Sequence, residues 1–255
     1  MGILENRKAI LVGASSGVGY GCALRFAEEG ADVVVGARRL EKLEALVDDA
    51  KQRGFAGKII PVECDVANEA DLDKIINKTV ELFGRIDILA CIAQGGLYQQ
   101  TYFMDTTPEL ANIYYQTGPI YTMLMIQKCM PYFEKQHYGR IITCASGSGV
   151  SNTPGFTGYA MAKAAIMAIT RKASKEFGKL GVVTNCFLPV IKNDVFGTDE
   201  QSKIAEKATL AASPVGFMGD AYEHCSPVVA FMASEGAGYM NGQFIGVCGG
   251  LQMLA

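Results

Sequence analysis

Residues 158–163 read Gly-Tyr-Ala-Met-Ala-Lys, and the tyrosine and lysine in this stretch could do chemistry together. The small, helix-forming residues around them predict a helix, on which positions four apart lie on one face, one above the other. The phenol of Tyr159 and the ammonium of Lys163 would then point the same way. The two residues are either an incidental surface pair, or a catalytic pair in which the proton of the tyrosine is easily transferred. The rest of the sequence must distinguish these alternatives.

A glycine-rich turn follows the first apolar run of the chain. Residues 12–19 read Val-Gly-Ala-Ser-Ser-Gly-Val-Gly and lie between a predicted strand and a predicted helix. Glycines at such a turn let backbone amides and the helix N-terminus approach a pyrophosphate. A tight turn without a ligand is the alternative, but the alternating α/β context favours a dinucleotide site. Its expected cofactor-binding residues are Gly13, Ser15, Ser16, Gly17, Val18 and Gly19.

The same stretch also satisfies the Gly-x-Ser-x-Gly pattern of the nucleophile elbow in α/β hydrolases. Ser15 would be the nucleophile of such an enzyme, and His224 could be offered as its histidine. Against this, the elbow would lie on the very first strand, and Gly19 would have no role. The dinucleotide site is therefore the preferred prediction.

The end of the second predicted strand indicates which dinucleotide binds. In dinucleotide folds an acid roughly 20 residues after the glycines holds the ribose 2′-hydroxyl. Here the strand ends in Val-Gly-Ala, and Arg38 and Arg39 follow at once. A carboxylate would repel a 2′-phosphate, whereas a guanidinium binds phosphate as a planar fork. The sequence therefore predicts NADP(H) in preference to NAD(H), with a solvated helix start as the alternative role of Arg39.

Short β-branched runs alternate with longer helical patterns along the chain. This order predicts a parallel sheet covered by helices on both faces, with right-handed crossovers. We expect one α/β domain over 1–255, a doubly wound Rossmann-type fold with a seven-stranded, mostly parallel sheet. The expected strands are 8–12, 32–36, 58–63, 85–93, 140–146, 182–188 and 242–247, and the expected helices are 18–29, 39–53, 70–84, 108–133 (with kinks or breaks at Pro119 and Pro131) and 159–177.

The composition of the 255 residues limits the partners that we expect. Hydrophobic residues make up 49% and charged residues 19%, which argues against disorder. The net charge of −3 gives no electrostatic reason to expect nucleic acid, and no stretch approaches the ~20 apolar residues that span a membrane. The eight cysteines are scattered without a CxxC, and there are two histidines, so we expect free thiols, no metal site and a cytoplasmic location.

Several features together resemble the short-chain dehydrogenase/reductase family over essentially the whole chain. They are the glycine turn, Asp65-Val66 after the third strand, Ser146 thirteen residues before Tyr159, the Tyr159/Lys163 pair and Gly249-Gly250 near the end. The stretch from Asn185 to Pro189 looks like the sixth strand of that family and the turn after it. Cys248 stands where aspartate is usual.

The resemblance implies a role for each residue of the catalytic set. Tyr159 would be the general acid in ketone reduction and the base in alcohol oxidation. A free phenol has a pKa near ~10, and the ammonium of Lys163 together with the oxidised cofactor would lower it. Lys163 would also hold the nicotinamide ribose, and Ser146 would hydrogen-bond the substrate oxygen as negative charge develops on it.

The resemblance also implies the remaining binding residues. Asp65, Val66, Ala93 and Pro189 join the glycine turn, Arg38, Arg39, Tyr159 and Lys163 in the cofactor site. Residues 190–217 resemble the substrate lid of the family. Aromatic and apolar residues around the expected cleft suggest a bulky, weakly polar substrate, such as a steroid-like, polycyclic or aromatic ketone. The expected substrate residues are Gln94, Tyr98, Ser148, Phe156 and Phe196, with Leu97, Tyr102, Phe103, Phe217 and Met218 as further apolar surface.

The sequence departs from the pattern of the family at three places in the expected site, one of which is Val190, which follows Pro189 where glycine is common. Where the family usually has Asn-Asn-Ala-Gly after the fourth strand, this chain has Cys-Ile-Ala-Gln at 91–94. Tyr115 stands where the family usually has the asparagine that holds a relay water, and an alignment shifted by one residue would place Gln116 there instead. A tyrosine hydroxyl both donates and accepts, so we expect Tyr115 to reroute the relay, with packing as its alternative role.

The leading hypothesis is therefore an NADP(H)-dependent oxidoreductase that interconverts a ketone and a secondary alcohol on a small-molecule substrate. The alternative is a nucleotide-sensing or scaffold protein on the same fold, whose catalysis is impaired by the changes at Cys91 and Tyr115. The presence of Ser146, Tyr159 and Lys163 together favours the enzyme, because a pure binder has no need of all three. The resemblance also implies a homotetramer or a homodimer.

Overall fold

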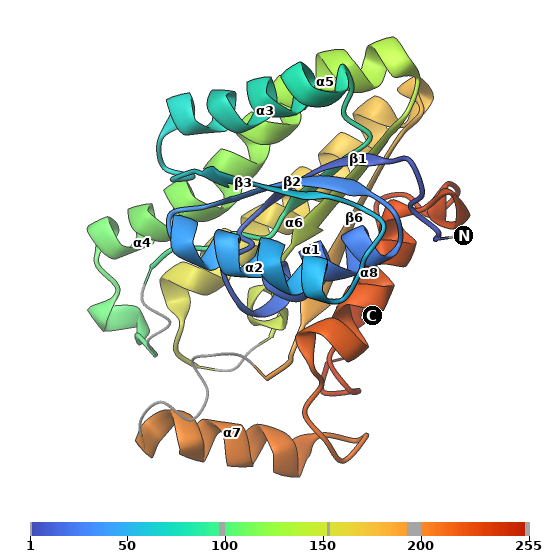
Figure 1. The fold of residues 1–255 in the computed structure, drawn as a ribbon. Helices are drawn as coiled ribbons and strands as arrows, with labels where there is room; N and C mark the ends of the chain where they lie inside the picture. Colours follow the sequence, from blue (N-terminus) through green and yellow to red (C-terminus); the bar gives the residue numbers. More distant parts are fainter. Residues whose placement is uncertain (1, 97–99, 152–153, 193–199, 253–255) are drawn as a thin grey trace.

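A seven-stranded parallel sheet forms the centre of the protein (Figure 1). The computed structural model describes residues 2–96, 100–151, 154–192 and 200–252. The strand order is β3-β2-β1-β4-β5-β6-β7, and every neighbouring pair is parallel. The strands are β1 (Lys8–Val12), β2 (Asp32–Ala37), β3 (Ile59–Glu63), β4 (Ile88–Cys91), β5 (Gly139–Cys144), β6 (Val182–Pro189) and β7 (Phe244–Val247).

Helices cover both faces of this sheet, because the central strands carry apolar side chains on both sides. Helices α1 (Gly17–Glu28), α2 (Leu40–Gln52) and α8 (Ser226–Ala233) pack on one face, where Phe26, Leu43 and Val229 belong to one buried cluster. Helices α3 (Glu69–Phe83) and α5 (Tyr121–Gln136) pack on the other, with Ile75 and Phe133 in a second cluster. The long helix α6 (Thr157–Phe177) lies beside α4 (Pro108–Tyr115) and β6, and α7 (Glu200–Ala212) stands apart below the sheet in Figure 1.

The predicted architecture is confirmed, with differences in detail. The sheet is wholly parallel, and β4 and β7 are shorter than the predicted strands. Helix α8 was not predicted. Among the described residues no helix combines the length and the hydropathy that crossing a bilayer requires.

The predicted break of the helix at 108–133 occurs at Pro119 and not at Pro131. Because Pro119 has no N–H, the regular hydrogen-bond ladder is interrupted, and residues Gln116–Ile120 form one π-helical turn between α4 and α5. Pro131 lies inside α5, which continues past it to Gln136. The π turn matters for function because it lies directly after the end of α4 at Tyr115.

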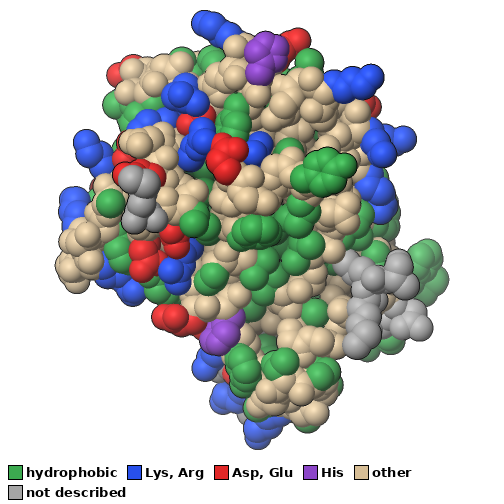
Figure 2. All heavy atoms as spheres, turned by 90° about the vertical axis from the view of Figure 1, so that its right-hand side faces the viewer, with side chains coloured by type: hydrophobic (Ala, Val, Ile, Leu, Met, Phe, Trp, Pro, Cys, Tyr) green, Lys and Arg blue, Asp and Glu red, His purple; other side chains and the backbone are tan. Residues whose placement is uncertain are grey.

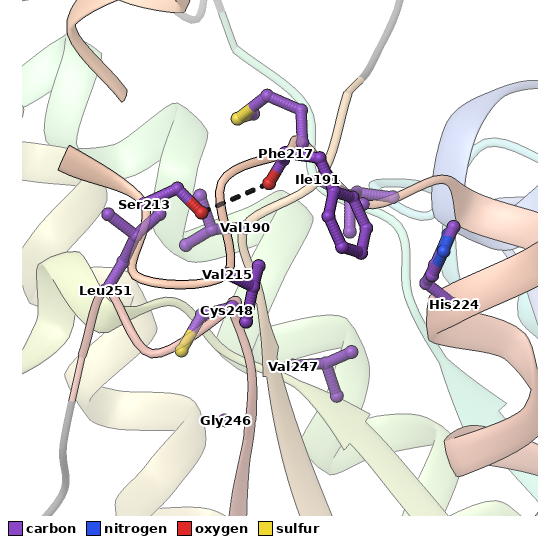
Figure 3. Close-up of a pocket in the computed structure, with 13 residues that line it drawn as sticks. Val190, Ile191, Ser213, Val215, Phe217, His224, Gly246, Val247, Cys248 and Leu251 are labelled. Carbon is purple, nitrogen blue, oxygen red and sulfur yellow. Dashed lines mark hydrogen bonds between the residues drawn. The ribbon is translucent and has the colours of Figure 1, made fainter. Parts of the chain in front are cut away.

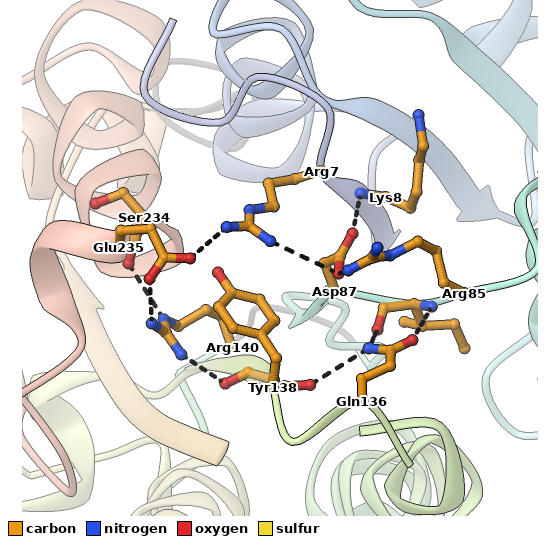
Figure 4. Close-up of polar contacts among 11 residues, drawn as sticks. Arg7, Lys8, Arg85, Asp87, Gln136, Tyr138, Arg140, Ser234 and Glu235 are labelled. Atoms are coloured by element: carbon orange, nitrogen blue, oxygen red, sulfur yellow. Dashed lines mark hydrogen bonds and ion pairs between the residues drawn. The ribbon is translucent and has the colours of Figure 1, made fainter. Parts of the chain in front are cut away.

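A network of charged side chains joins the starting ends of the strands (Figure 4). The Asp87 carboxylate is fully buried and accepts hydrogen bonds from the backbone N–H of Lys8, at 2.9 Å, and from the Arg85 guanidinium. Nearby, the ring of Tyr138 lies between two guanidiniums, with Arg7 at 4.3 Å and Arg140 at 4.4 Å from its centroid. The network ties β1, β4 and β5 together at the edge where the strands begin. The groups of this network therefore lie away from the opposite edge, where the strands end.

Candidate active site

A large cleft lies at the edge of the sheet where the strands end. Its volume is about 900 Å³, and its wall is formed by the residues that follow β1, β2, β3, β4, β5 and β6 together with the start of α6. In a doubly wound sheet this edge is where a dinucleotide binds. The structure brings nearly all of the predicted site residues together here, namely Gly13, Ser15, Ser16, Gly17, Val18, Gly19, Arg38, Arg39, Asp65, Val66, Ala93, Gln94, Ser146, Ser148, Tyr159, Lys163 and Pro189.

The glycine turn has the shape that a pyrophosphate requires. Gly17 is the first residue of α1 and has a φ of +53°, and a Cβ built on it would meet nothing within 4 Å. The first turn of α1 holds no acidic residue, and its N-cap, Ser16, makes no side-chain capping bond. No side chain of the N-cap satisfies the first N–H groups of this helix, and a phosphate there would be stabilised by them.

The other two glycines of the turn allow it to fold closely. A Cβ on Gly13 would lie 2.5 Å from the backbone nitrogen of Ala93, and a Cβ on Gly19 would lie 1.9 Å from the carbonyl oxygen of Gly13. Either contact is far inside van der Waals distance. The turn can thus approach both the end of β4 and its own helix only because these positions lack side chains.

Two guanidiniums lie beside the glycine turn. Arg38 and Arg39 follow the last residue of β2 directly, and both are exposed and line the cleft. An Nη2–H of Arg39 donates to the hydroxyl of Ser15 at 2.8 Å, which places this charge against the turn. After β3, the carboxylate of Asp65 accepts a hydrogen bond from the backbone N–H of Ala67 at 3.0 Å. After β4, the carbonyl of Ala93 accepts a hydrogen bond from the hydroxyl of Tyr121 at 3.0 Å.

The predicted catalytic residues lie together at the other end of the cleft. Lys163 is only 2% exposed, and its ammonium donates to the carbonyl oxygen of Cys144 at 2.9 Å. The same nitrogen lies 5.5 Å from the centroid of the Tyr159 ring, so the two side chains share one face of α6 as the spacing predicted. The Ser146 hydroxyl accepts from the backbone N–H of Ser148 at 3.2 Å and hydrogen-bonds its hydroxyl at 3.3 Å.

In the protein without a cofactor the pKa of Tyr159 is raised, whereas the lowering that we expect involves the bound oxidised cofactor and stays a prediction. Burial raises the pKa of this phenol, and a hydrogen bond with Ser146 opposes the shift without cancelling it. Burial also lowers the pKa of Lys163, because removing an ammonium from water disfavours its charged form. In the protein alone, burial therefore favours the neutral phenol of Tyr159.

Tyr114, which was not predicted, packs directly on this phenol. Its ring meets that of Tyr159 edge to face with the centroids 5.9 Å apart, and the residue is 4% exposed. Glycines leave room for the Tyr114 ring on two sides. A Cβ on Gly96 would lie 2.6 Å from this ring, and a Cβ on Gly158 would lie 3.1 Å from it. The predicted relay residue Tyr115 is half-buried and does not line the cleft, so its role stays a prediction.

Gln94 connects the end of β4 to the π turn. Its Nε2 donates to the carbonyl of Tyr114 at 3.1 Å and to the hydroxyl of Thr117 at 3.2 Å. Gly118 makes room for the amide, because a Cβ there would lie 2.7 Å from its Oε1. Gln94 thus helps to hold Tyr114 in contact with Tyr159. This contact is separate from the substrate role of Gln94, which stays a prediction.

A second cavity of about 280 Å³ adjoins the cleft (Figure 3). The two share Val190, Ile191 and Leu251 in their walls. The second cavity is mainly apolar. Phe217 is one of its lining residues, and its carbonyl accepts a hydrogen bond from the Ser213 hydroxyl at 3.1 Å. Its remaining lining residues are Val215, Met218, Gly219, His224, Gly246, Val247, Cys248 and Gly249.

Some predicted substrate residues lie elsewhere. Tyr98 and Phe196 fall outside the described residues, and so does Leu97. Phe156 precedes α6 but does not line the cleft. Tyr102 and Phe103, expected as apolar surface of the cleft, are 51% and 78% exposed and do not line it either. The lining residues that we did not predict include Tyr114, Thr117, Ala208, Thr209, Ala212, Leu251 and Gln252.

The hydrolase alternative is not supported by the geometry. The hydroxyl of Ser15 accepts a hydrogen bond from Arg39, whereas a nucleophilic serine would donate one to a histidine. His224 lines the second cavity, and its Nδ1 accepts from the backbone N–H of Asp220 at 3.0 Å. Within the described part of the chain no three His, Cys, Asp or Glu side chains form a group that could hold a metal ion.

Comparison with known proteins identifies the family of the chain. The family model described as enoyl-(acyl carrier protein) reductase matches residues 13–252. The (2S)-[(R)-hydroxy(phenyl)methyl]succinyl-CoA dehydrogenase subunit BbsD of Thauera aromatica is 31% identical over 255 residues, which cover 100% of both chains. The 3-oxoacyl-[acyl-carrier-protein] reductase FabG of Thermotoga maritima is 31% identical over 251 residues, 97% of this chain and 98% of the relative.

The chain belongs to the short-chain dehydrogenase/reductase family. Among solved structures, levodione reductase superposes with a TM-score of 0.91 at 26% identity, covering 96% of this chain and 97% of the other. A short-chain type dehydrogenase/reductase from Mycobacterium marinum superposes with a TM-score of 0.88 at 28% identity, covering 98% and 97%. As a short-chain dehydrogenase/reductase the protein is an oxidoreductase of CH–OH and C=O groups that uses a nicotinamide cofactor.

The open space above Gly17 leads to a prediction about cofactor affinity. Gly17→Ala should weaken dinucleotide binding by about tenfold or more, because the new methyl group takes the place of a phosphate oxygen and a bond to a charged group is worth ~1.5–3 kcal/mol. Titration of the cofactor by isothermal calorimetry measures this effect.

Gly84→Ala is the matched control for Gly17→Ala. Gly84 ends α3 with a φ of +68°, and a Cβ there would also meet nothing within 4 Å. Both variants should lose about 1 kcal/mol of stability from the strained backbone, but Gly84→Ala should bind the dinucleotide like the parent protein. Equal affinities for the two variants would show that no phosphate lies at Gly17.

Proposed function

We propose that this short-chain dehydrogenase/reductase is an NADP(H)-dependent enzyme that interconverts a bulky, largely apolar ketone and its secondary alcohol. The observation that carries the proposal is the arrangement of one cleft. A buried neutral phenol, an ammonium and a serine hydroxyl lie at one end, and a glycine turn with two guanidiniums lies at the other.

The reaction follows from what each side chain can hold or move. A bound NADPH would supply the hydride to the carbonyl carbon. The backbone N–H of Ser148 holds the oxygen of Ser146 in place. The hydroxyl proton of Ser146, which points to the Ser148 hydroxyl, would turn to donate a hydrogen bond to the substrate oxygen as charge develops on it. Tyr159 would release its proton to that oxygen, and the raised pKa means that the proton is present at neutral pH.

Lys163 would stabilise the tyrosinate that this step leaves behind. One of its three N–H donors is used by the carbonyl of Cys144, which fixes the ammonium beneath the cleft. The remaining donors are available for the nicotinamide ribose and for the relay that returns a proton to Tyr159. Tyr114 would keep bulk water away from the phenol, because its ring covers one edge of the Tyr159 ring.

The preference for NADP(H) is supported by the charges at the end of β2. No carboxylate stands there to hold a ribose 2′-hydroxyl, and Arg39 is already oriented toward the glycine turn by its bond to Ser15. A 2′-phosphate would be bound by Arg38 and Arg39 in the planar manner that guanidiniums allow.

The substrate class is supported by the volumes and the lining of the two cavities. The cleft of about 900 Å³ has room for a large substrate beside a dinucleotide, and the adjoining cavity is lined mainly by apolar side chains. We place the apolar body of the substrate at Val190, Ile191 and Leu251, where the two cavities meet.

The surface supports a homodimer or homotetramer. Figure 2 shows hydrophobic side chains gathered across the middle of one face of the molecule. Exposed large hydrophobic residues include Phe231 and Tyr239, and β7 is an edge strand of the sheet. Sedimentation equilibrium tests the assembly, and a monomer would contradict it.

All eight cysteines are free and buried, which favours a reducing, cytoplasmic compartment.

The proposed function is tested by following the absorbance of the reduced nicotinamide with a panel of aryl and polycyclic ketones. We expect turnover with NADPH, and we expect Tyr159→Phe to lower kcat by roughly 10²–10⁴-fold because the proton donor is lost. The affinity of Tyr159→Phe for NADPH should stay within about twofold of the parent. Binding of NADPH without turnover of any ketone or alcohol would favour the sensor instead of the enzyme.

The cofactor preference is tested by reversing one charge. Arg39→Asp should lower kcat/KM for NADPH by roughly ten- to a hundredfold, the worth of a lost hydrogen bond to a charged group, and leave the value for NADH unchanged or higher. Lys42→Asp is the control, since Lys42 lies in the first turn of α2, whose N-cap is Arg39, is exposed and does not line the cleft. If both variants change NADPH kinetics alike, net charge and not a 2′-phosphate contact explains the effect.

A further inference from the structure

The ring of Tyr114 packs on the catalytic phenol from a second helix. Tyr114 lies at the end of α4, and Tyr159 lies in the first turn of α6. The two rings meet at an angle of 75° with their centroids 5.9 Å apart, which is one of the arrangements that aromatic pairs prefer. Tyr114 is buried, whereas Tyr159 is half-buried. The Tyr114 ring therefore fills space beside the phenol that water, or the Tyr159 ring itself, could otherwise enter.

Two glycines leave room for this ring. Gly96 comes from the loop after β4 and has a φ of +97°, and Gly158 is the residue directly before Tyr159. A Cβ on Gly158 would lie 3.1 Å from the Tyr114 ring and 3.4 Å from the α-carbon of Ala111, so α4 comes close to the start of α6 at this position. The ring is thus enclosed between the loop after β4 and the helix that carries Tyr159.

The backbone of Tyr114 is held by a side chain in place of a missing N–H group. In a π-helical turn the carbonyl of one residue accepts from the N–H five positions later, and for Tyr114 that position is Pro119, which has no N–H. The amide of Gln94 donates to this carbonyl instead, at 3.1 Å, and to the hydroxyl of Thr117 at 3.2 Å. That hydroxyl donates in turn to the carbonyl of Ile113 at 2.6 Å. The end of α4 is therefore fixed although the regular hydrogen-bond ladder is interrupted.

Burial is the largest cause of the raised pKa of Tyr159. The titratable groups that face this phenol are the Cys144 thiol at the end of β5, Lys163 on α6 and Tyr114 itself. The Ser146 hydroxyl forms a hydrogen bond with it. A side chain that keeps water from the phenol therefore affects how firmly its proton is held.

We propose that Tyr114 is a positioning residue for the general acid, because its ring holds the phenol of Tyr159 in place and keeps water from one edge of it. Tyr114 transfers no proton itself and acts through Tyr159. The inference deepens the proposed function and rests on it, since Tyr159 is the proton donor of that reaction. The site needs an aromatic ring at position 114, so an aromatic replacement should serve there and an aliphatic one should not.

The test compares Tyr114→Leu and Tyr114→Phe in the reduction of a ketone that the parent enzyme turns over with NADPH. Tyr114→Leu should lower kcat by roughly ten- to a hundredfold, because the proton donor is no longer held in line with the substrate oxygen. KM for the ketone should stay within about twofold of the parent. Ketone reduction needs the protonated phenol, so the loss of rate at high pH should begin at a lower pH in Tyr114→Leu. Tyr114→Phe should retain kcat to within about threefold and keep the pH profile of the parent.

Phe133→Leu is the matched control. Phe133 is a fully buried ring on α5 that also occupies space left by a glycine, since a Cβ on Gly139 would lie 2.7 Å from it. It lines neither cavity. This variant should lower the melting temperature as Tyr114→Leu does, but it should keep the kcat and the pH profile of the parent. Tyr114→Met, with the same expected result as Tyr114→Leu, serves if the leucine variant does not fold.

A titration of the free protein tests the contact without any turnover. The phenolate absorbance of Tyr114→Leu at pH 10, minus that of the same variant with Tyr159→Phe added, isolates Tyr159. This difference should be larger than the corresponding difference for the parent, because water reaches the phenol and the burial that raises its pKa is reduced.

The proposal is overturned if Tyr114→Leu keeps the pH profile or the phenolate absorbance of the parent. It is also overturned if Tyr114→Phe loses as much activity as Tyr114→Leu, or if Phe133→Leu shifts the pH profile equally. A parent enzyme that reduces no ketone would instead refute the proposed function, and the titration would then still decide whether Tyr114 shields Tyr159.

Discussion

The site depends on one costly interaction, the burial of the Lys163 ammonium beneath the ring of Tyr159. Removing an ammonium from water is unfavourable unless other groups replace the lost hydration. The carbonyl of Cys144 replaces part of it, and the fold holds this carbonyl in place because Cys144 ends strand β5 inside the sheet. The arrangement is useful because the same loss of solvent keeps Tyr159 protonated, while the cation is in position to stabilise the tyrosinate once the proton has left.

The rest of the molecule supports this buried pair from two edges of the sheet. At the edge where the strands begin, charged side chains around Asp87 and Tyr138 join neighbouring strands. At the edge where the strands end, the turns that form the wall of the cleft pack closely on one another. Glycines stand where two backbone segments come closest, as at Gly13 and Gly19. The π turn at Gln116–Ile120 and the amide of Gln94 then set the ring of Tyr114 against Tyr159.

Much of the fold and of the catalytic set could be predicted from the sequence, because in those parts the local pattern of residues decides the structure. The apolar runs marked the strands, and the spacing of Tyr159 and Lys163 placed both on one face of a helix. Tyr114 could not be found in this way, because its position depends on a π turn and on the glycines at 96 and 158. Gln252 reaches the cleft only through the turn at Gly249 and Gly250, both of which have positive φ values. The aromatic side chains of Tyr102 and Phe103 predict a place in the lining of the cleft, but tertiary packing leaves them exposed.

The most direct test of the account is a spectrophotometric titration of the phenol of Tyr159. The phenolate absorbance of the parent protein, minus that of Tyr159→Phe, isolates this one group. In the free protein the group should still be protonated at pH 10, the usual pKa of tyrosine, because burial raises its pKa. Bound NADP⁺ should shift the transition to lower pH, since the positive nicotinamide favours the phenolate. Ionisation of Tyr159 at or below the usual pKa in the free protein, or a transition that bound NADP⁺ leaves unchanged, would contradict the central claim.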